Sequence, residues 1–132
     1  MTTSNLQEEV MISSFYGKSF VDDLAKWLGW ADSHGFLFKI KNQDSLSAVA
    51  VMRPISNPSL TSDNQYHFDA EAKSIYVDIA CAIKKNDMHK LLILALKKFK
   101  HCTQICFRRN GGEKIHTYTK LNRLLNLLGA LA

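Results

Sequence analysis

The sequence predicts an α/β (α+β) fold in which helices flank a mixed sheet. Segments rich in strand-forming residues alternate with segments whose apolar residues recur at helical spacing. In the second half the order is strand, helix, strand, which predicts a right-handed crossover between parallel strands. The chain has 132 residues, of which 46% are hydrophobic and 22% charged, as expected for one globular domain. We therefore expect residues 1–132 to form a single domain, with residues 1–14 loosely docked.

The first half of the chain predicts one helix and a β-hairpin. Apolar residues share a helical face in Ser19–Gly29, where the serine can cap the start and the glycine suits the end. The two strands that follow, Phe36–Lys41 and Leu46–Met52, are predicted to pair through a polar four-residue turn. Arg53-Pro54 ends the second strand, because proline has no N–H to donate to a sheet. Residues 56–65 are predicted to form a loop.

The second half contains the strongest strand signal. Ser74–Ile83 is apolar on both faces except at Asp78, as in a central strand that is covered on both sides. The other predicted elements are a helix over Met88–Lys100, a strand over Thr103–Arg108 and, after a turn at Asn110–Gly112, either a hairpin strand over Lys114–Thr119 or direct entry into a last helix over Lys120–Leu128.

The positive charge is concentrated near the C-terminus. The net charge is +5, but residues 1–83 hold 6 Lys or Arg against 10 Asp or Glu, whereas residues 84–132 hold 11 against 2. This asymmetry favours a polyanionic partner, which could be nucleic acid, a phosphorylated cofactor or an acidic protein. A solvated basic face without a specific ligand is the alternative interpretation.

Several classes of protein are disfavoured by the pattern of residues. The N-terminus lacks a basic start followed by an apolar core, and the longest apolar run is far shorter than the roughly 20 residues of a membrane span. We therefore expect a cytoplasmic protein with no membrane partner. Of the three cysteines, Cys81, Cys102 and Cys106, the first and last lie inside apolar runs and are expected to be small buried side chains rather than reactive thiols. The histidines form neither HxH nor HExxH, so no metal site is predicted.

Two residues are candidate catalytic proton acceptors. Asp78 lies mid-strand among apolar neighbours, where a carboxylate is costly unless it is paired. It could be a general base with a raised pKa, it could have a structural partner, or it could lie at the surface of the sheet. His67, two residues before Asp69, is the second candidate, as one half of an acid–base pair.

Two basic clusters are candidate binding sites. Lys84, Lys85 and Asn86 lie between a strand and a helix N-terminus, where backbone N–H groups and the helix dipole attract phosphate. An ordinary basic turn is the alternative interpretation. The second cluster has aromatic residues among its basic ones, and such a mixture can bind single-stranded nucleic acid. Its members are Arg108, Arg109, Lys114, Lys120 and Arg123.

The order of elements resembles that of the GNAT superfamily of N-acetyltransferases, over roughly residues 19–131. Ser74–Ile83 is similar to the family's central strand, Ile83–Met88 to its pyrophosphate loop, and Leu124–Ala130 to its terminal helix. The chain also resembles the small divergent GNAT-like proteins of phages and prophages.

The resemblance implies an N-acyltransferase that uses acetyl-CoA. It implies that the backbone of Ile79, Ala80 and Cys81 holds the pantetheine arm, and that Lys84 and Lys85 contact the phosphates. The Ile83–Met88 loop lacks the family's glycines, so a relative that has lost activity is the alternative within the family. Outside it, the alternatives are a non-catalytic module whose basic C-terminal cluster binds nucleic acid or an acidic protein, and a structural or assembly protein that acts through oligomerisation. The oligomeric state is left open.

Overall fold

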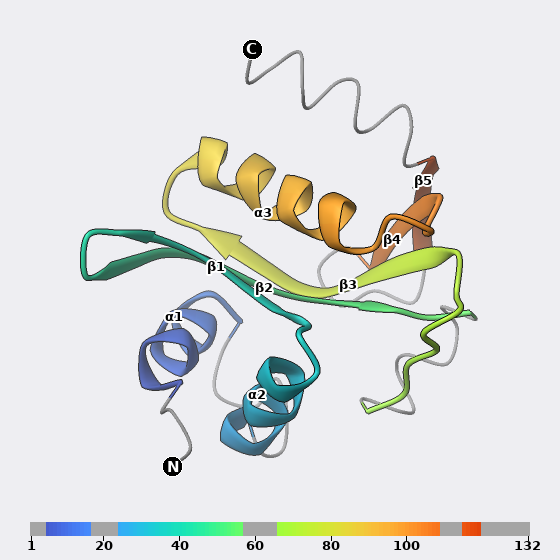
Figure 1. The fold of residues 1–132 in the computed structure, drawn as a ribbon. Helices are drawn as coiled ribbons and strands as arrows, with labels where there is room; N and C mark the ends of the chain where they lie inside the picture. The colour runs from blue at the N-terminus through green and yellow to red at the C-terminus, as the bar shows by residue number, and fades with distance from the viewer. Residues whose placement is uncertain (1–4, 17–23, 57–65, 109–114, 120–132) are drawn as a thin grey trace. The chain divides into compact units, whose positions relative to one another are not determined.

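The computed structural model describes residues 5–16, 24–56, 66–108 and 115–119 of the chain. Its helices and strands, shown in Figure 1, are α1 (Leu6–Tyr16), α2 (Leu24–Ser33), β1 (Leu37–Asn42), β2 (Ser45–Pro54), β3 (Ser74–Ala82), α3 (Lys85–Lys98), β4 (Gln104–Arg108) and β5 (Ile115–Thr119). The β3–β4 pair is parallel, whereas the β1–β2 and β4–β5 pairs are antiparallel. The predicted α/β class with a mixed sheet is therefore confirmed.

The chain divides into two compact units, and strands β2 and β3 contribute residues to both. The first unit contains Met1–Val51 and Ile79–Leu91, and the second contains Met52–Asp78 and Leu92–Ala132. The strand order is β1-β2-β3 in the first unit and β2-β3-β4-β5 in the second. Each unit has buried apolar residues of its own. The expectation of one domain stays a prediction.

In the first unit, two helices lie on the same face of a β-hairpin (Figure 1). β1 and β2 pair from Leu37↔Val51 to Asn42↔Ser45. The amide of Phe36 donates to the carbonyl oxygen of Ala31 at 2.7 Å, which ties the end of α2 to the start of β1. The buried side chains of this unit include Ile12, Trp27, Leu28, Ala31, Phe38, Val49, Val51, Ile79 and Leu91.

The expectation that residues 1–14 are loosely docked is wrong for the part that forms α1. Ile12 is fully buried, and Glu8 is 3% exposed. The Glu8 carboxylate forms an ion pair with Lys39 of β1 at 3.2 Å. Tertiary contacts therefore hold this helix, although its apolar residues do not follow a regular helical spacing.

Helix α2 ends later in the chain than the helix predicted over Ser19–Gly29. Residues 19–23 of that prediction lie outside the described residues. Gly29 lies inside the helix and not at its end, because the helix continues to bury Ala31. Gly35, with a φ of 76°, takes the left-handed conformation after the helix.

The hairpin turn is tighter than the predicted four residues. β1 continues to Asn42 and β2 begins at Ser45, which leaves Gln43 and Asp44 to turn the chain. Gln43 has a φ of 59°, in the left-handed region that glycine and asparagine enter more easily. β2 also continues past Met52 to Pro54.

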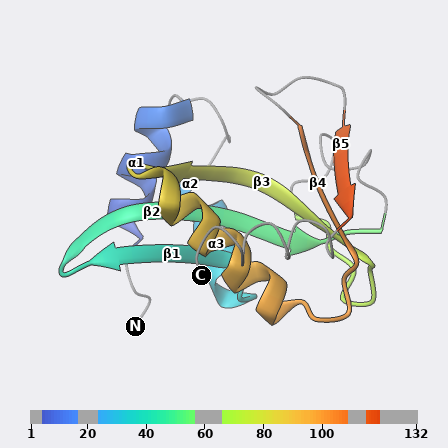
Figure 2. The ribbon, with the colours of Figure 1, turned by 90° about the horizontal axis from the view of Figure 1, so that it is seen from above.

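In the second unit, β3 and β4 are in parallel register from Ser74↔Gln104 to Val77↔Phe107. This confirms the parallel pair predicted from the strand–helix–strand order. β4 and β5 lie side by side as an antiparallel hairpin (Figure 2), so the chain takes the hairpin and not the direct entry into a last helix. The buried side chains of this unit include Met52, Ile55, Ala72, Ile75, Tyr76, Ala95, Leu96, Phe99, Cys102, Ile105 and Cys106.

Helix α3 begins at Lys85, earlier than the predicted start at Met88. Asp87 therefore lies in its first turn, where its amide donates to the Lys84 carbonyl oxygen at 3.0 Å. The predicted helix over Lys120–Leu128 lies outside the described residues. Of the helices in the described part of the chain, none has the length and apolar character needed to cross a membrane.

Candidate functional site

Asp78 of β3, in the second unit, is held by a buried arginine. Nη2 of Arg53, on β2, donates to Asp78 Oδ1 at 2.9 Å. The exposed fraction is 0% for the Arg53 side chain and 10% for that of Asp78. The second oxygen, Oδ2, is buried and has no hydrogen-bond partner among the residues that the structure describes. The carboxylate is thus anchored through one oxygen and keeps acceptor capacity on the other.

The guanidinium of Arg53 has two further contacts that fix its orientation. Nη1 donates to the backbone carbonyl oxygen of His67 at 2.6 Å. The guanidinium carbon lies 6.0 Å from the ring centroid of Tyr76. A planar, fully charged group held on two oxygens and an aromatic ring cannot rotate freely. Arg53 therefore positions the Asp78 carboxylate.

Burial dominates the acidity of Asp78. Loss of hydration disfavours the charged carboxylate and raises the pKa of Asp78 to about 7, against the opposing charge and hydrogen bond of Arg53. A carboxyl group that titrates near neutrality can both accept and release a proton at physiological pH. This is the acidity that a general base needs.

His67, the other candidate base, reaches Arg53 through its backbone carbonyl. Asp69, its expected partner, accepts hydrogen bonds from the Ser56 hydroxyl and from the Glu71 amide. These two bonds, with Ser56 the larger contributor, lower the pKa of Asp69. The role of the His67 imidazole as a base stays a prediction.

In the first unit, the backbone of β3 at Ala80 is bound by a side chain from α1. The Tyr16 hydroxyl donates to the Ala80 carbonyl oxygen at 3.0 Å and accepts from the Ala80 N–H at 3.1 Å. Burial raises the pKa of Tyr16, against the effect of the Ala80 hydrogen bond. The hydroxyl therefore keeps its proton at neutral pH and can donate and accept together. Ala80 is one of the three residues predicted to hold the pantetheine arm.

The two neighbours of Ala80 in that prediction are buried, with exposed fractions of 1% for Ile79 and 2% for Cys81. Burial raises the pKa of the Cys81 thiol to about 11, against the effect of the Val49 backbone. This thiol is therefore protonated and a poor nucleophile at neutral pH. Cys81, Cys102 and Cys106 are all free and buried, which confirms the place in the interior that was expected for Cys81 and Cys106.

The predicted phosphate-binding residues Lys84, Lys85 and Asn86 are exposed, at the start of α3. A helix N-terminus with two lysines attracts anions. Asp87 opposes this attraction from the same turn, where it is 6% exposed and pairs with Lys90 at 3.6 Å. The phosphate contact stays a prediction.

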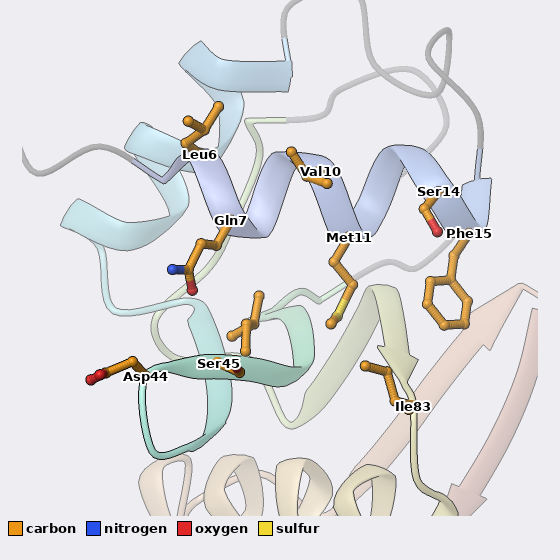
Figure 3. A pocket seen from close by; sticks show the side chains of 10 residues that line it. Leu6, Gln7, Val10, Met11, Ser14, Phe15, Asp44, Ser45 and Ile83 are labelled. Carbon is orange, nitrogen blue, oxygen red and sulfur yellow. The ribbon is translucent and has the colours of Figure 1, made fainter.

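An apolar groove lies beside α1 in the first unit, with a volume of about 510 Å³. In Figure 3, Met11 and Phe15 point from α1 toward the side of the groove where Ile83 lies. Phe15 is 52% exposed and Ile83 68% exposed. The other lining residues are Leu6, Gln7, Val10, Ser14, Asp44, Ser45 and Leu46. The groove offers mainly apolar surface to solvent.

Of the second basic cluster, the structure describes only Arg108, at the end of β4. Arg109, Lys114, Lys120 and Arg123 lie outside the described residues. Binding of nucleic acid or of an acidic protein through this cluster stays a prediction.

The sequence did not point to Arg53 or Tyr16 as site residues. A signal for Arg53 existed, because it is the only charge that interrupts the apolar second strand and Asp78 is the only charge within the apolar third. Two opposite charges in adjacent apolar strands favour a buried pair. Tyr16 had no such signal, since it follows a segment that was expected to be loose.

Within the described ranges, no three His, Cys, Asp or Glu side chains gather where they could hold a metal ion. The chain matches no protein-family model, no curated protein and no solved structure. The resemblance to GNAT proteins therefore stays a prediction, based on the order of elements and on the residues in and after β3.

Proposed function

We propose that the protein is a divergent acyl-CoA-dependent N-acyltransferase in which Asp78 accepts the proton of the amine substrate. The observation that supports this best is the state of the Asp78 carboxylate. Oδ1 is fixed by Arg53, and Oδ2 is buried without a hydrogen-bond partner in the described part of the chain. The reaction class comes from the resemblance to GNAT proteins.

Transfer of an acyl group from a thioester to an amine requires a base. The amine nitrogen attacks the carbonyl carbon, the carbon–sulfur bond breaks, and the nitrogen must lose a proton. A carboxylate of pKa about 7 is ionised in a large fraction of molecules at neutral pH and is still basic enough to take that proton. Acyl-CoA, when bound, supplies the thioester.

The groups proposed to hold acyl-CoA are the backbone of β3 at Ala80 and the side chains of Lys84 and Lys85. A strand N–H and C=O are suited to the amides of a pantetheine arm. Exposed lysines at the start of a helix are suited to phosphates. The Asp87 carboxylate in the same turn weakens this attraction, so we expect modest affinity.

The substitution Asp78→Asn tests the proposed base. Asparagine keeps the size of the side chain and can still accept from Arg53, but it cannot take up the proton. We expect release of the CoA thiol in the presence of small primary amines to slow by roughly 100-fold or more. Binding of acetyl-CoA, measured by calorimetry, should persist. In the wild type the rate should rise through about pH 7, as Asp78 loses its proton, and in the variant this rise should be absent.

His67→Asn is the matched comparison. The contact of His67 with Arg53 comes from the backbone, so this variant keeps it while it removes the imidazole. Loss of activity in His67→Asn, with Asp78→Asn as active as the wild type, would assign the base to His67. Absence of acetyl-CoA binding at millimolar concentration would overturn the proposed function.

A further inference from the structure

The contact between Tyr16 and Ala80 has the form of a strand-pairing contact made by a side chain. In a sheet, a neighbouring strand offers one acceptor to an N–H and one donor to a C=O. The Tyr16 hydroxyl supplies both to Ala80, at 3.1 Å and 3.0 Å. The Tyr16 hydroxyl thus occupies the hydrogen-bonding position beside Ala80 that the backbone of a neighbouring extended chain would otherwise occupy.

The rest of α1 is held independently of this contact. Ile12 is fully buried, and Glu8 pairs with Lys39 at 3.2 Å. Tyr16 is the last residue of the helix, and 41% of its surface is exposed. Its ring can therefore turn toward solvent while the helix stays in place, and this motion needs only side-chain rotation.

We propose that Tyr16 is a displaceable plug, which occupies the backbone N–H and C=O of Ala80 on β3 in the free protein and yields them to the pantetheine arm of a CoA ligand. The proposal rests on the proposed function for the identity of the ligand. It adds that binding competes with an internal contact. The observed affinity is therefore the intrinsic affinity multiplied by the fraction of molecules in which the plug is open.

The substitution Tyr16→Phe removes the hydroxyl and keeps the ring. We expect the variant to bind coenzyme A with a dissociation constant roughly tenfold lower than that of the wild type, because two hydrogen bonds no longer have to be broken. Calorimetry with coenzyme A alone, without an amine, measures this. Tyr66→Phe is the matched control, since Tyr66 is 40% exposed and lies in the second unit. Its affinity should equal that of the wild type.

Amide hydrogen exchange at Ala80 gives a second readout that needs no activity. In the free protein the Ala80 amide should exchange faster in Tyr16→Phe than in the wild type. Coenzyme A should restore protection in the variant. Equal exchange in both free proteins would show that the hydroxyl does not protect this amide and would overturn the plug.

The two proposals fail in different ways. If wild type and Tyr16→Phe bind coenzyme A equally, or if the variant binds more weakly, the plug is overturned while acyl transfer is unaffected. If the variant binds more tightly but neither protein transfers an acyl group to any amine, the plug stands and the enzyme proposal fails. If neither protein binds coenzyme A at millimolar concentration, both are overturned.

Discussion

Arg53 and Asp78 depend on each other for their charge. A guanidinium stays protonated even when it is fully buried, so the carboxylate of Asp78 supplies its compensating charge. Burial of both groups is costly, and the attraction of Arg53 offsets only part of this cost, because the pKa of Asp78 stays raised. The sequence predicted that Asp78 needs a partner. It could not identify the partner, because that depends on which residues of β2 and β3 face each other.

Replacement of Arg53 by Met should be strongly destabilising. At pH 8, where Asp78 is ionised, it leaves a buried carboxylate without its counter-charge, and breaking such a pair costs roughly 3–5 kcal/mol. Lys90→Met is the matched comparison, because the Lys90 side chain is 53% exposed in its pair with Asp87. That loss should cost less than about 1 kcal/mol. Urea unfolding of both variants measures the difference, and similar losses would contradict a special role of Arg53.

The stability of the protein should fall as the pH rises from about 4 to 7. The pKa of Asp78 rises on folding from 3.8 to about 7, so in this window the folded chain holds a proton that the unfolded chain has released. Folding takes up a proton there, and raising the pH opposes it. Urea midpoints at pH 5 and pH 8 should differ in the wild type and much less in Asp78→Asn.

Asp69→Asn is the control for that pH dependence. The pKa of Asp69 is lowered, so this group is ionised in both states throughout the window. Its variant should keep the wild-type difference between pH 5 and pH 8. If Asp69→Asn lost this difference, the pH dependence of stability would come from Asp69 and not from Asp78.

At the scale of the elements, the sequence predicted those whose signal is local. The hairpin strands, β3 and the parallel pair with β4 have apolar, strand-forming composition, and the structure confirms them. α1 was missed because its stability comes from Ile12 and Glu8, whose partners lie elsewhere in the chain. The turn was predicted too long, because polar residues at strand ends resemble turn residues. The start of α3 was placed too late, because Asn86 and Asp87 are residue types that often cap helices, whereas here they lie inside the helix.

The hairpin turn offers a test at this scale. Gln43 holds a φ of 59°, which costs a residue with a side chain roughly 1 kcal/mol relative to glycine. Gln43→Gly should therefore raise the free energy of unfolding by about 0.5 kcal/mol, after the greater freedom of glycine in the unfolded chain is counted. Asp44→Gly, at a position whose φ is not positive, should lower it. Chemical denaturation of both variants measures the sign, and a loss in both would contradict this account of the turn.

At the scale of the whole molecule, the distribution of charge is the clearest feature that the fold does not explain. The excess of Lys and Arg lies in residues 84–132, and part of it lies on the exposed surface of α3, at Lys97 and Lys98. Composition predicts such an asymmetry well, because it requires no knowledge of contacts. It cannot distinguish among polyanions, since that depends on how the charges are arranged in space.

If the second basic cluster binds nucleic acid, the affinity for a single-stranded oligonucleotide should fall steeply as the salt concentration rises. Lys120→Gln combined with Arg123→Gln should reduce the slope of log affinity against log salt by about two. Lys26→Gln combined with Lys41→Gln, in the acidic part of the chain, should leave it unchanged. Fluorescence anisotropy over a range of salt concentrations measures this. Binding that is absent or independent of salt would argue against nucleic acid.

The Tyr16 plug on β3 also affects how the free protein behaves at high concentration. An N–H and a C=O left open on a strand edge invite pairing with another chain, and native proteins protect such edges. Here Ala80 lies in the same unit as the exposed side chains of Phe15 and Ile83, and apolar surface of this kind strengthens self-association. We therefore expect Tyr16→Phe to form aggregates more readily than the wild type, and coenzyme A to suppress them. The Tyr16 side chain, which is proposed to lower the affinity for coenzyme A, would thus also reduce self-association of the protein.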